Sequence, residues 1–73
     1  MIVVSVHQVD GGTPAAASHN GGYALHFYNL AEAYLYAQSE SLPQEGGSLT
    51  TQSWSRVYND GIMVAQYVGG TAI

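Results

Sequence analysis

The sequence predicts a small α+β domain in which one helix packs on one face of an antiparallel sheet, with the element order β-β-α-β-β. Three observations support this prediction. Two strand-like segments precede an alanine-rich segment with a helix-capping sequence, two more strand-like segments follow it, and glycine pairs separate the segments. The 73 residues suffice for one domain, so we expect residues 1–73 to form a single unit.

Two strands are expected before the helix, at residues 2–9 and 23–27, because both segments are rich in β-branched and aromatic residues. Alternation with a period of two places three residues of each segment on one face, namely Ile2, Val4 and Val6 in the first strand and Tyr23, Leu25 and Phe27 in the second. We expect the face of the first strand that carries Ile2, Val4 and Val6 to contact the core. The connection at residues 10–22 is long for so small a domain, and connections of this length are often functional.

The helix is expected to begin after Asn29, because asparagine is a favoured N-cap and Glu32 completes a variant of the capping box. Alanine-rich sequence then supports a helix that ends shortly before Pro43, since the residue before a proline avoids the helical region. Helical spacing defines the predicted core stripe, which consists of Leu30, Ala33, Tyr34 and Ala37. Leu35 and Tyr36 fall outside this stripe, so they are either exposed or covered by a second surface.

Two more strands are expected at residues 49–58 and 62–68, on either side of the hairpin sequence Asn59-Asp60-Gly61. Two registers remain open. A two-residue turn at Asp60-Gly61 pairs Trp54 with Tyr67 and Tyr58 with Met63, whereas a type I turn with a glycine bulge pairs Ser53 with Tyr67 and Tyr58 with Ile62. A slip of one residue exchanges the two faces of a strand, so the sequence leaves open which face of this hairpin contacts the core.

Charge is scarce and mostly negative. Charged residues make up 8% of the chain, compared with about 25% in ordinary domains. Arg56 is the single basic side chain, and the net charge is −4. A chain with one cation cannot neutralise a run of phosphates, which argues against direct binding of nucleic acid or of an anionic membrane. The same charge suits a partner protein with a basic surface.

The sequence also restricts the location and the assembly of the protein. No apolar run approaches the roughly 20 residues of a membrane-spanning helix, and the first residues lack the basic segment of a signal peptide. Cysteine is absent, which excludes disulfides and thiolate metal sites. We therefore expect a cytoplasmic protein, located in the host cytoplasm if a phage encodes it. Because so small a domain has a small core, we also expect a homodimer or higher oligomer.

Neither a metal site nor a catalytic site is expected. The three histidines, His7, His19 and His26, lack a recognisable zinc-ligand spacing, although His7 and His26 share a face if the first two strands pair. Two serine–histidine–aspartate groups can be assembled, namely Ser5, His7 and Asp10 or Ser18, His19 and Asp10. Neither group comes with a nucleophile-elbow motif. A chain this short also lacks the volume for a large ligand cleft, so we expect no enzyme activity and no cofactor.

Aromatic residues are more numerous than so small an interior needs, with six tyrosines, one tryptophan and one phenylalanine. We expect Tyr23, Tyr34 and Tyr67 to fill the core. Tyrosine and tryptophan exposed together are typical of binding hot spots, so the surplus predicts a partner-binding patch rimmed by acids. The predicted residues of this patch are Trp54, Tyr36, Tyr58, Leu35, Asp10, Glu45 and Asp60.

Two resemblances to known proteins bear on function. The segment Gly21-Gly22-Tyr23-Ala24-Leu25-His26-Phe27, followed by Leu30-Ala31-Glu32-Ala33 and Ala37, resembles a contracted HicB-type antitoxin domain, in which a strand with a Gly-Gly-Tyr start leads into a Glu-Ala-rich helix. The chain lacks the proline and the intervening strand of that family. In type rather than in motif, a compact, acidic, cysteine-free chain of this length resembles the small inhibitors that phages encode against host defences, anti-CRISPR proteins among them.

The leading hypothesis is a noncatalytic phage or mobile-element inhibitor that covers a basic, nucleic-acid-handling host protein. An antitoxin-like or regulatory partner subunit is the alternative that the HicB resemblance implies, and a small metal- or ligand-binding domain is a third. The acids are few and lie mostly near predicted turns, which argues against close mimicry of DNA. Trp54, Tyr36 and Tyr58 are the predicted anchors of the interface.

Overall fold

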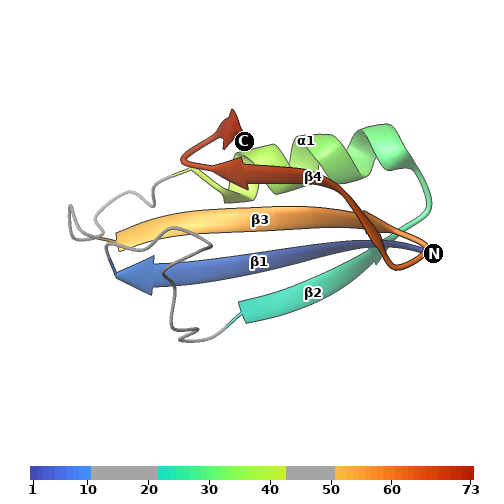
Figure 1. Cartoon of the computed structure of the whole chain (residues 1–73), viewed down its shortest axis with the longest axis horizontal. Coiled ribbons are helices and arrows are strands. Elements are labelled where there is room, and N and C mark those ends of the chain that lie inside the picture. The colour runs from blue at the N-terminus through green and yellow to red at the C-terminus, as the bar shows by residue number, and fades with distance from the viewer. Residues whose placement is uncertain (11–21, 43–50) are drawn as a thin grey trace.

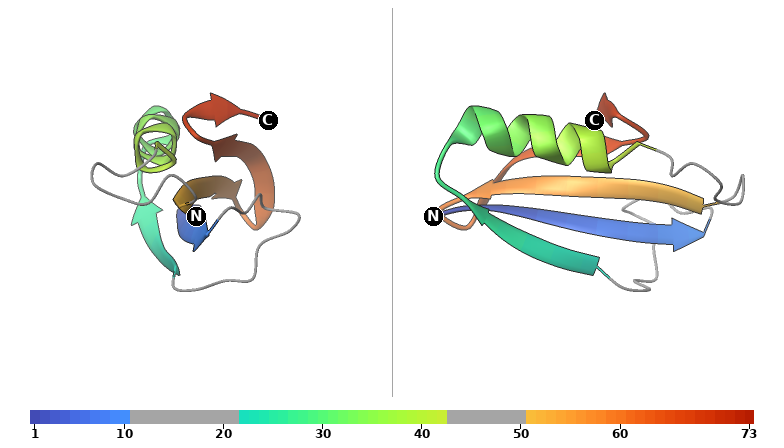
Figure 2. Two further views of the ribbon diagram at one scale, coloured as in Figure 1. Left: turned by 90° about the vertical axis from the view of Figure 1, so that its left-hand side faces the viewer. Right: turned by 180° about the vertical axis from the view of Figure 1, so that it is seen from behind.

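The computed structural model describes residues 1–10, 22–42 and 51–73, and within these ranges it contains five strands and one helix. In chain order the elements are β1 (Ile2–Asp10), β2 (Gly22–Phe27), α1 (Leu30–Glu40), β3 (Thr51–Asn59), β4 (Ile62–Val68) and β5 (Thr71–Ala72). The strands form one antiparallel sheet in the order β2-β1-β3-β4-β5, with α1 against one face (Figures 1 and 2). The predicted α+β architecture is confirmed, with β5 as an addition.

The central strand β1 organises the sheet, because it pairs with β2 on one side and with β3 on the other. Both pairings run along the strand without a register shift. Val4 lies opposite Leu25 of β2 and opposite Val57 of β3, so these three residues share the face that α1 covers. The expected inward face of the first strand is therefore confirmed.

The core between helix and sheet is narrow and made of small side chains. Ala33 and Ala37 of α1 are fully buried and pack against the valines of β1 and β3. Leu30 and Tyr34 are partly buried against the same cluster, which confirms the predicted helix stripe. Because alanine projects only a methyl group, the helix axis lies close to the two central strands.

The helix begins where the capping sequence predicts. Asn29 has extended backbone angles, and its side chain accepts a hydrogen bond from the Glu32 backbone N–H at 3.1 Å. The helix ends at Glu40, and Ser41 follows as the C-cap. Pro43, the predicted terminator, lies outside the described residues.

The β3–β4 hairpin combines a two-residue turn with a bulge. Asp60 and Gly61 form the turn with positive φ angles of 52° and 82°. Tyr58 pairs with Met63, as the first predicted register requires. A bulge between Val57 and Tyr58 then shifts the pairing, so that Trp54 lies opposite Val68 and not opposite Tyr67. Neither predicted register therefore holds along the whole hairpin.

A second tight turn, at Gly69 and Gly70, produces the unexpected strand β5. Both glycines have positive φ angles, 58° and 82°, which side-chain-bearing residues rarely adopt. The Gly70 backbone is tied to the end of α1 because its N–H donates to Ser41 Oγ at 3.0 Å and its carbonyl accepts from Gln38 Nε2 at 3.0 Å. A two-residue strand leaves no hydrophobic periodicity, which is why the sequence did not predict it.

We predict that Asn29→Ala lowers the free energy of unfolding by about 0.5–2 kcal/mol, because the Glu32 N–H loses its side-chain acceptor. Urea denaturation followed by circular dichroism measures the change. Asn29→Ser is the matched control, since serine caps helices about as well as asparagine. Equal midpoints for Asn29→Ala and the wild type would show that this cap does not stabilise the fold.

Two buried serines of β3 provide a second, internally controlled prediction. Ser53 and Ser55 are both buried on the same strand. The Ser55 hydroxyl donates to the Ala37 carbonyl at 2.6 Å, whereas the Ser53 hydroxyl has no hydrogen-bond partner among the described residues. We expect Ser55→Ala to cost about 1 kcal/mol of stability and Ser53→Ala to be neutral or stabilising. Equal losses for the two variants would contradict this difference.

Candidate protein-binding surface

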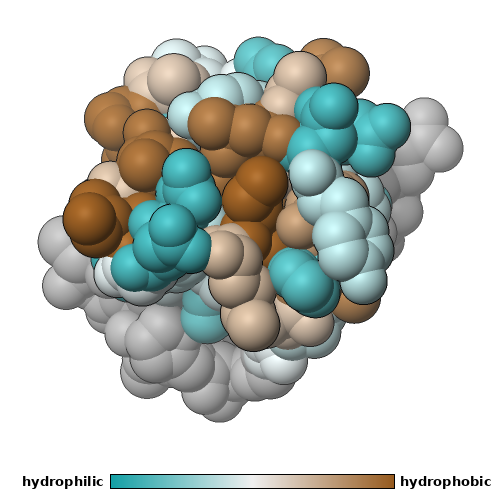
Figure 3. Space-filling model, turned by 90° about the vertical axis from the view of Figure 1, so that its right-hand side faces the viewer, coloured by the Kyte–Doolittle hydropathy of each residue, from teal (hydrophilic) through white to brown (hydrophobic). Residues whose placement is uncertain are grey.

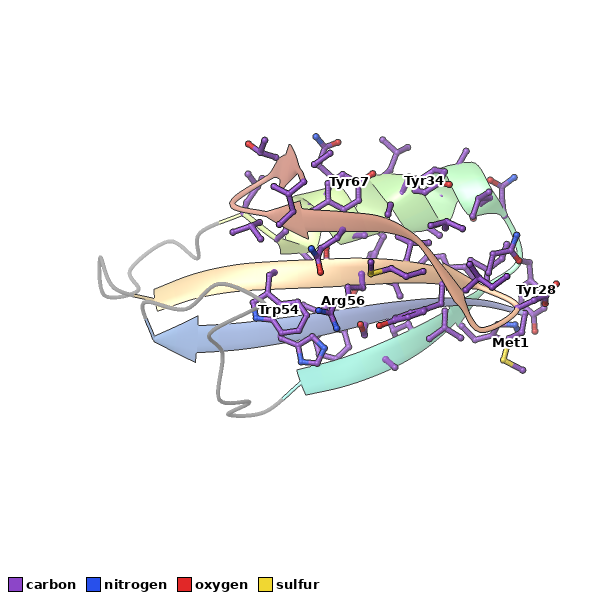
Figure 4. The ribbon with its side chains drawn as sticks, viewed as in Figure 1. Met1, Tyr28, Tyr34, Trp54, Arg56 and Tyr67 are labelled. Carbon is purple, nitrogen blue, oxygen red and sulfur yellow. The ribbon has the colours of Figure 1, made fainter. Side chains whose placement is uncertain are left out.

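Four exposed apolar side chains lie at one end of the sheet. Met1, Tyr28, Ile62 and Met63 are exposed to 70%, 92%, 69% and 49%. Ile2 lies opposite Phe27 on one side and Asn59 on the other, so Met1 is flanked by Tyr28 and by the β3–β4 turn. This end of the molecule faces the viewer in Figure 3, where apolar atoms occupy much of the surface, and Figure 4 shows Met1 and Tyr28 there. We call these four residues, with Asp60, the sheet-end surface.

Asp60 supplies a carboxylate to the sheet-end surface. Its backbone N–H donates to the Met1 carbonyl at 2.8 Å, and its exposed carboxylate forms an ion pair with the terminal ammonium of Met1. The hydrogen bond from this ammonium, followed by its charge, holds the pKa of Asp60 below its usual value. The carboxylate is therefore ionised at neutral pH.

Tyr58, a predicted anchor, lies beside this surface. It pairs with Met63 across the hairpin and is partly buried. On the same face of the sheet, the rings of His26 and Tyr28 are 4.9 Å apart with their planes tilted by 49°. The apolar end thus continues onto the sheet face opposite the helix, through Tyr28 on one side and Met63 on the other.

Tyr36, another predicted anchor, belongs to a different part of the surface. Its ring packs at 5.2 Å from the ring of Phe27, and its hydroxyl lies 2.9 Å from the hydroxyl of Tyr23. The Tyr23 hydroxyl also donates to Glu40 Oε2 at 3.3 Å. Partial desolvation of the Tyr23 hydroxyl, then its hydrogen bond with Tyr36 and the nearby charge of Glu40, raise the pKa of Tyr23. Tyr23 is 45% exposed, so the expectation that it fills the core is wrong.

Trp54 is not the exposed anchor that the aromatic surplus suggested. Its side chain is fully buried on the sheet face opposite the helix. Its ring stacks on that of His7, with centroids 4.0 Å apart and an interplanar angle of 14°, because these two residues are direct cross-strand partners. Arg56 lies over the Trp54 ring at 4.8 Å (Figure 4). An exposed Trp54 is therefore a wrong expectation, because the ring is buried on this face and stacks on His7.

The single basic side chain, Arg56, is fixed by contacts with its own chain. Arg56 is partly buried, contacts the Trp54 ring and donates from Nε to Gln66 Oε1 at 2.7 Å. Arg56 and Gln66 are cross-strand partners on β3 and β4, which fixes this geometry. The guanidinium therefore uses its Nε donor to bind Gln66 and one face to contact the Trp54 ring.

Glycine at position 22 is required by the neighbouring strand. A Cβ atom at Gly22 would lie 2.8 Å from His7 Nδ1 and 2.9 Å from the Val6 carbonyl oxygen. Both distances are shorter than real Cβ contacts, so any larger residue would displace the His7 ring from its stack on Trp54. The Gly-Gly-Tyr start of the second strand thus has a local packing reason.

The remaining predicted site residues are dispersed. Leu35 is exposed on the helix, away from the sheet-end surface, and Asp10 ends β1 with a side chain outside the described set. Glu45, Ser18 and His19 lie outside the described residues. Of the predicted residues, the structure brings Tyr58 and Asp60 to one end of the sheet and separates them from Trp54, Tyr36 and Leu35.

Sequence reasoning missed four of the residues at this end, namely Met1, Tyr28, Ile62 and Met63. A usable signal was present, because Tyr28 and Ile62 each stand next to a chain reversal. Antiparallel pairing brings such reversals to the same end of a sheet. Among the described residues, no cluster of three histidine, aspartate or glutamate side chains is arranged to hold a metal ion.

Comparison with known proteins gives no assignment, because no protein-family model, no curated protein and no solved structure matches the chain. The resemblances to HicB-type antitoxins and to phage inhibitors therefore stay predictions. Within the described ranges, no helix has the length and apolar content needed to cross a membrane.

The raised pKa of Tyr23 predicts a pH dependence of stability. In the unfolded chain tyrosine ionises near pH 10, whereas folded Tyr23 keeps its proton to higher pH. The unfolded state therefore loses this proton first, and the free energy of unfolding falls as the pH rises above about 10. We expect Tyr23→Phe to make this fall shallower. Urea titrations from neutral to alkaline pH measure it, with Tyr28→Phe as a control; identical slopes for the two variants would contradict the assignment.

Proposed function

We propose that the chain is a noncatalytic protein-binding module that uses its sheet-end surface to cover a basic surface on a nucleic-acid-handling protein. The observation that carries this proposal is the gathering of Met1, Tyr28, Ile62 and Met63 beside the ionised carboxylate of Asp60. Exposed apolar groups collected in one place, with a polar rim, are typical of protein interaction sites.

The chemistry of this surface suits an anchor-and-rim interface. Tyr28 is almost fully exposed, and tyrosine provides a large contact area with few rotatable bonds. Ile62 adds a rigid apolar side chain directly after the turn that carries Asp60. A partner that buries these groups gains apolar contact at the centre and meets the carboxylate of Asp60, paired with the Met1 ammonium, at the margin.

The charge distribution supports a basic partner. The net charge of −4 attracts a positive surface and speeds encounter with it. The one basic side chain, Arg56, already contacts Trp54 and Gln66, so it is poorly placed to bind phosphate. A protein surface that itself binds nucleic acid has the complementary charge.

Within this class, we propose an inhibitor of the kind that phages and mobile elements encode, acting in the host cytoplasm. The second candidate is an antitoxin-like subunit. One observation favours it, because β2 begins at Gly22 and is followed by the alanine-rich helix α1, although the HicB family has a further strand between the two. The identity of the captured partner separates the two, since an antitoxin binds a toxin encoded beside it and an inhibitor binds a host defence protein.

The experiment is affinity capture of the partner with the wild-type chain, followed by binding measurements on variants. We expect Tyr28→Ala and Ile62→Ala each to weaken binding by about 2 kcal/mol, as anchor residues do. Leu35→Ala is the matched control, because Leu35 is as exposed as Ile62 but lies on the helix. If Leu35→Ala weakens binding and Ile62→Ala does not, the surface is assigned wrongly.

Asp60→Asn tests the electrostatic rim separately. Asparagine tolerates a positive φ angle, so the turn is retained while the charge is removed. We expect a slower association rate and a weaker dependence of that rate on salt, with little change in dissociation. Glu32→Gln removes the same charge from the exposed start of the helix and should change the association rate less. An acidic partner, or equal effects of the two variants, would contradict this role of Asp60.

A further inference from the structure

The two margins of the sheet differ in how well they are protected against pairing with another strand. At the β4 margin, a bulge interrupts the strand and β5 covers its final residues. Bulges and short covering strands are common ways to block an edge. At the β2 margin, Gly22–Phe27 pairs with β1 without a register shift, and no other strand of the described ranges pairs with it.

The sequence of β2 also lacks the residues that usually guard an edge. The strand reads Gly-Tyr-Ala-Leu-His-Phe, with no lysine, no carboxylate and no proline. A regular and uncharged edge presents free backbone donors and acceptors to any strand of suitable length. The β2 edge is therefore open to pairing.

The helix leaves the β2 side chains incompletely covered. Helix α1 packs mainly over β1 and β3 and contacts β2 least among the four long strands. Tyr23 and Leu25 lie on the helix-facing side of β2, yet they remain 45% and 41% exposed. An element added beside β2 on this side would bury both.

We infer that two copies of the chain pair antiparallel through their β2 edges and form one continuous sheet. A two-fold axis perpendicular to the sheet relates antiparallel edges, so both helices lie on the same side. Side-chain alternation requires that Tyr23, Leu25 and Phe27 of one copy have residues of this same set as cross-strand partners in the second copy. The longest pairings that satisfy this alternation are centred on Ala24 or on Leu25, because the midpoint of β2 falls between them.

A second copy is the occupant that the strand fits best. Centred on Ala24, Tyr23 lies opposite Leu25 of the second copy; centred on Leu25, it lies opposite Phe27 of the second copy, so each arrangement sets apolar on apolar residues. Because β2 carries no carboxylate, self-pairing brings no acids directly opposite one another despite the net charge of −4. The pairing also adds buried apolar surface to a domain whose own core is small. It is independent of the proposed partner, since the β2 edge and the sheet-end surface consist of different residues.

The first test is sedimentation analysis of the free chain at micromolar to millimolar concentrations. We expect the wild type to reach about twice the monomer mass of 7.7 kDa. Leu25→Lys should remain monomeric, because a charge at the centre of the edge opposes its own copy. Leu35→Lys is the matched control and should dimerise as the wild type does, since Leu35 is exposed on the helix. Circular dichroism of each variant verifies that the fold is retained.

The second test locates the two-fold axis without relying on loss of association. The chain has no cysteine, so a single introduced cysteine gives an unambiguous cross-link. We expect either Ala24→Cys or Leu25→Cys to form a disulfide-linked dimer rapidly under mild oxidation, and Leu35→Cys to form little. A wild type that stays monomeric throughout, a Leu25→Lys variant that still dimerises, or cross-linking that is no faster at position 24 or 25 than at position 35 overturns the inference.

Discussion

The close packing of α1 on the two central strands determines most of what this fold exposes. Ala33 and Ala37 are fully buried against Val4 and Val57, and the Ser55 hydroxyl reaches the helix backbone at Ala37. This contact joins helix and sheet over a narrow strip. Because the helix has 11 residues and two small inward side chains, it covers mainly β1 and β3 and covers the β2 margin least.

Side chains on the two faces of the sheet are buried by different contacts. On the helix face, aliphatic side chains are covered by α1, whereas on the opposite face the buried Trp54 stacks on His7 and contacts Arg56. His7, Trp54 and Arg56 of the central strands therefore contact one another. What remains for a partner is the apolar end of the sheet, where Tyr28 and Ile62 project beside Asp60. The proposed binding surface follows from this division of roles.

The sequence predicted the local features well and the surface poorly. The Asn29 cap, the helix stripe and the inward valines follow from spacing within a few residues, and each is confirmed. The contact of Trp54 with His7 depends on the pairing of two strands that are distant in sequence, and the pairing of Trp54 with Val68 depends on a bulge that no residue type predicts. Tyr23 and Tyr36 likewise exchange a hydrogen bond across two elements, which periodicity within either element cannot reveal.

The central claim is that the turn end of the sheet, and not the helix surface, meets the partner. Nuclear magnetic resonance with a paramagnetic cosolute measures this directly, because the cosolute broadens only accessible side chains. In the free chain the Ile62 methyl and Tyr28 ring signals should be strongly broadened, as should those of Leu35. In the complex with the captured partner, Ile62 and Tyr28 should become protected while Leu35 stays accessible. Protection of Leu35 with continued broadening of Ile62 and Tyr28 would contradict the account.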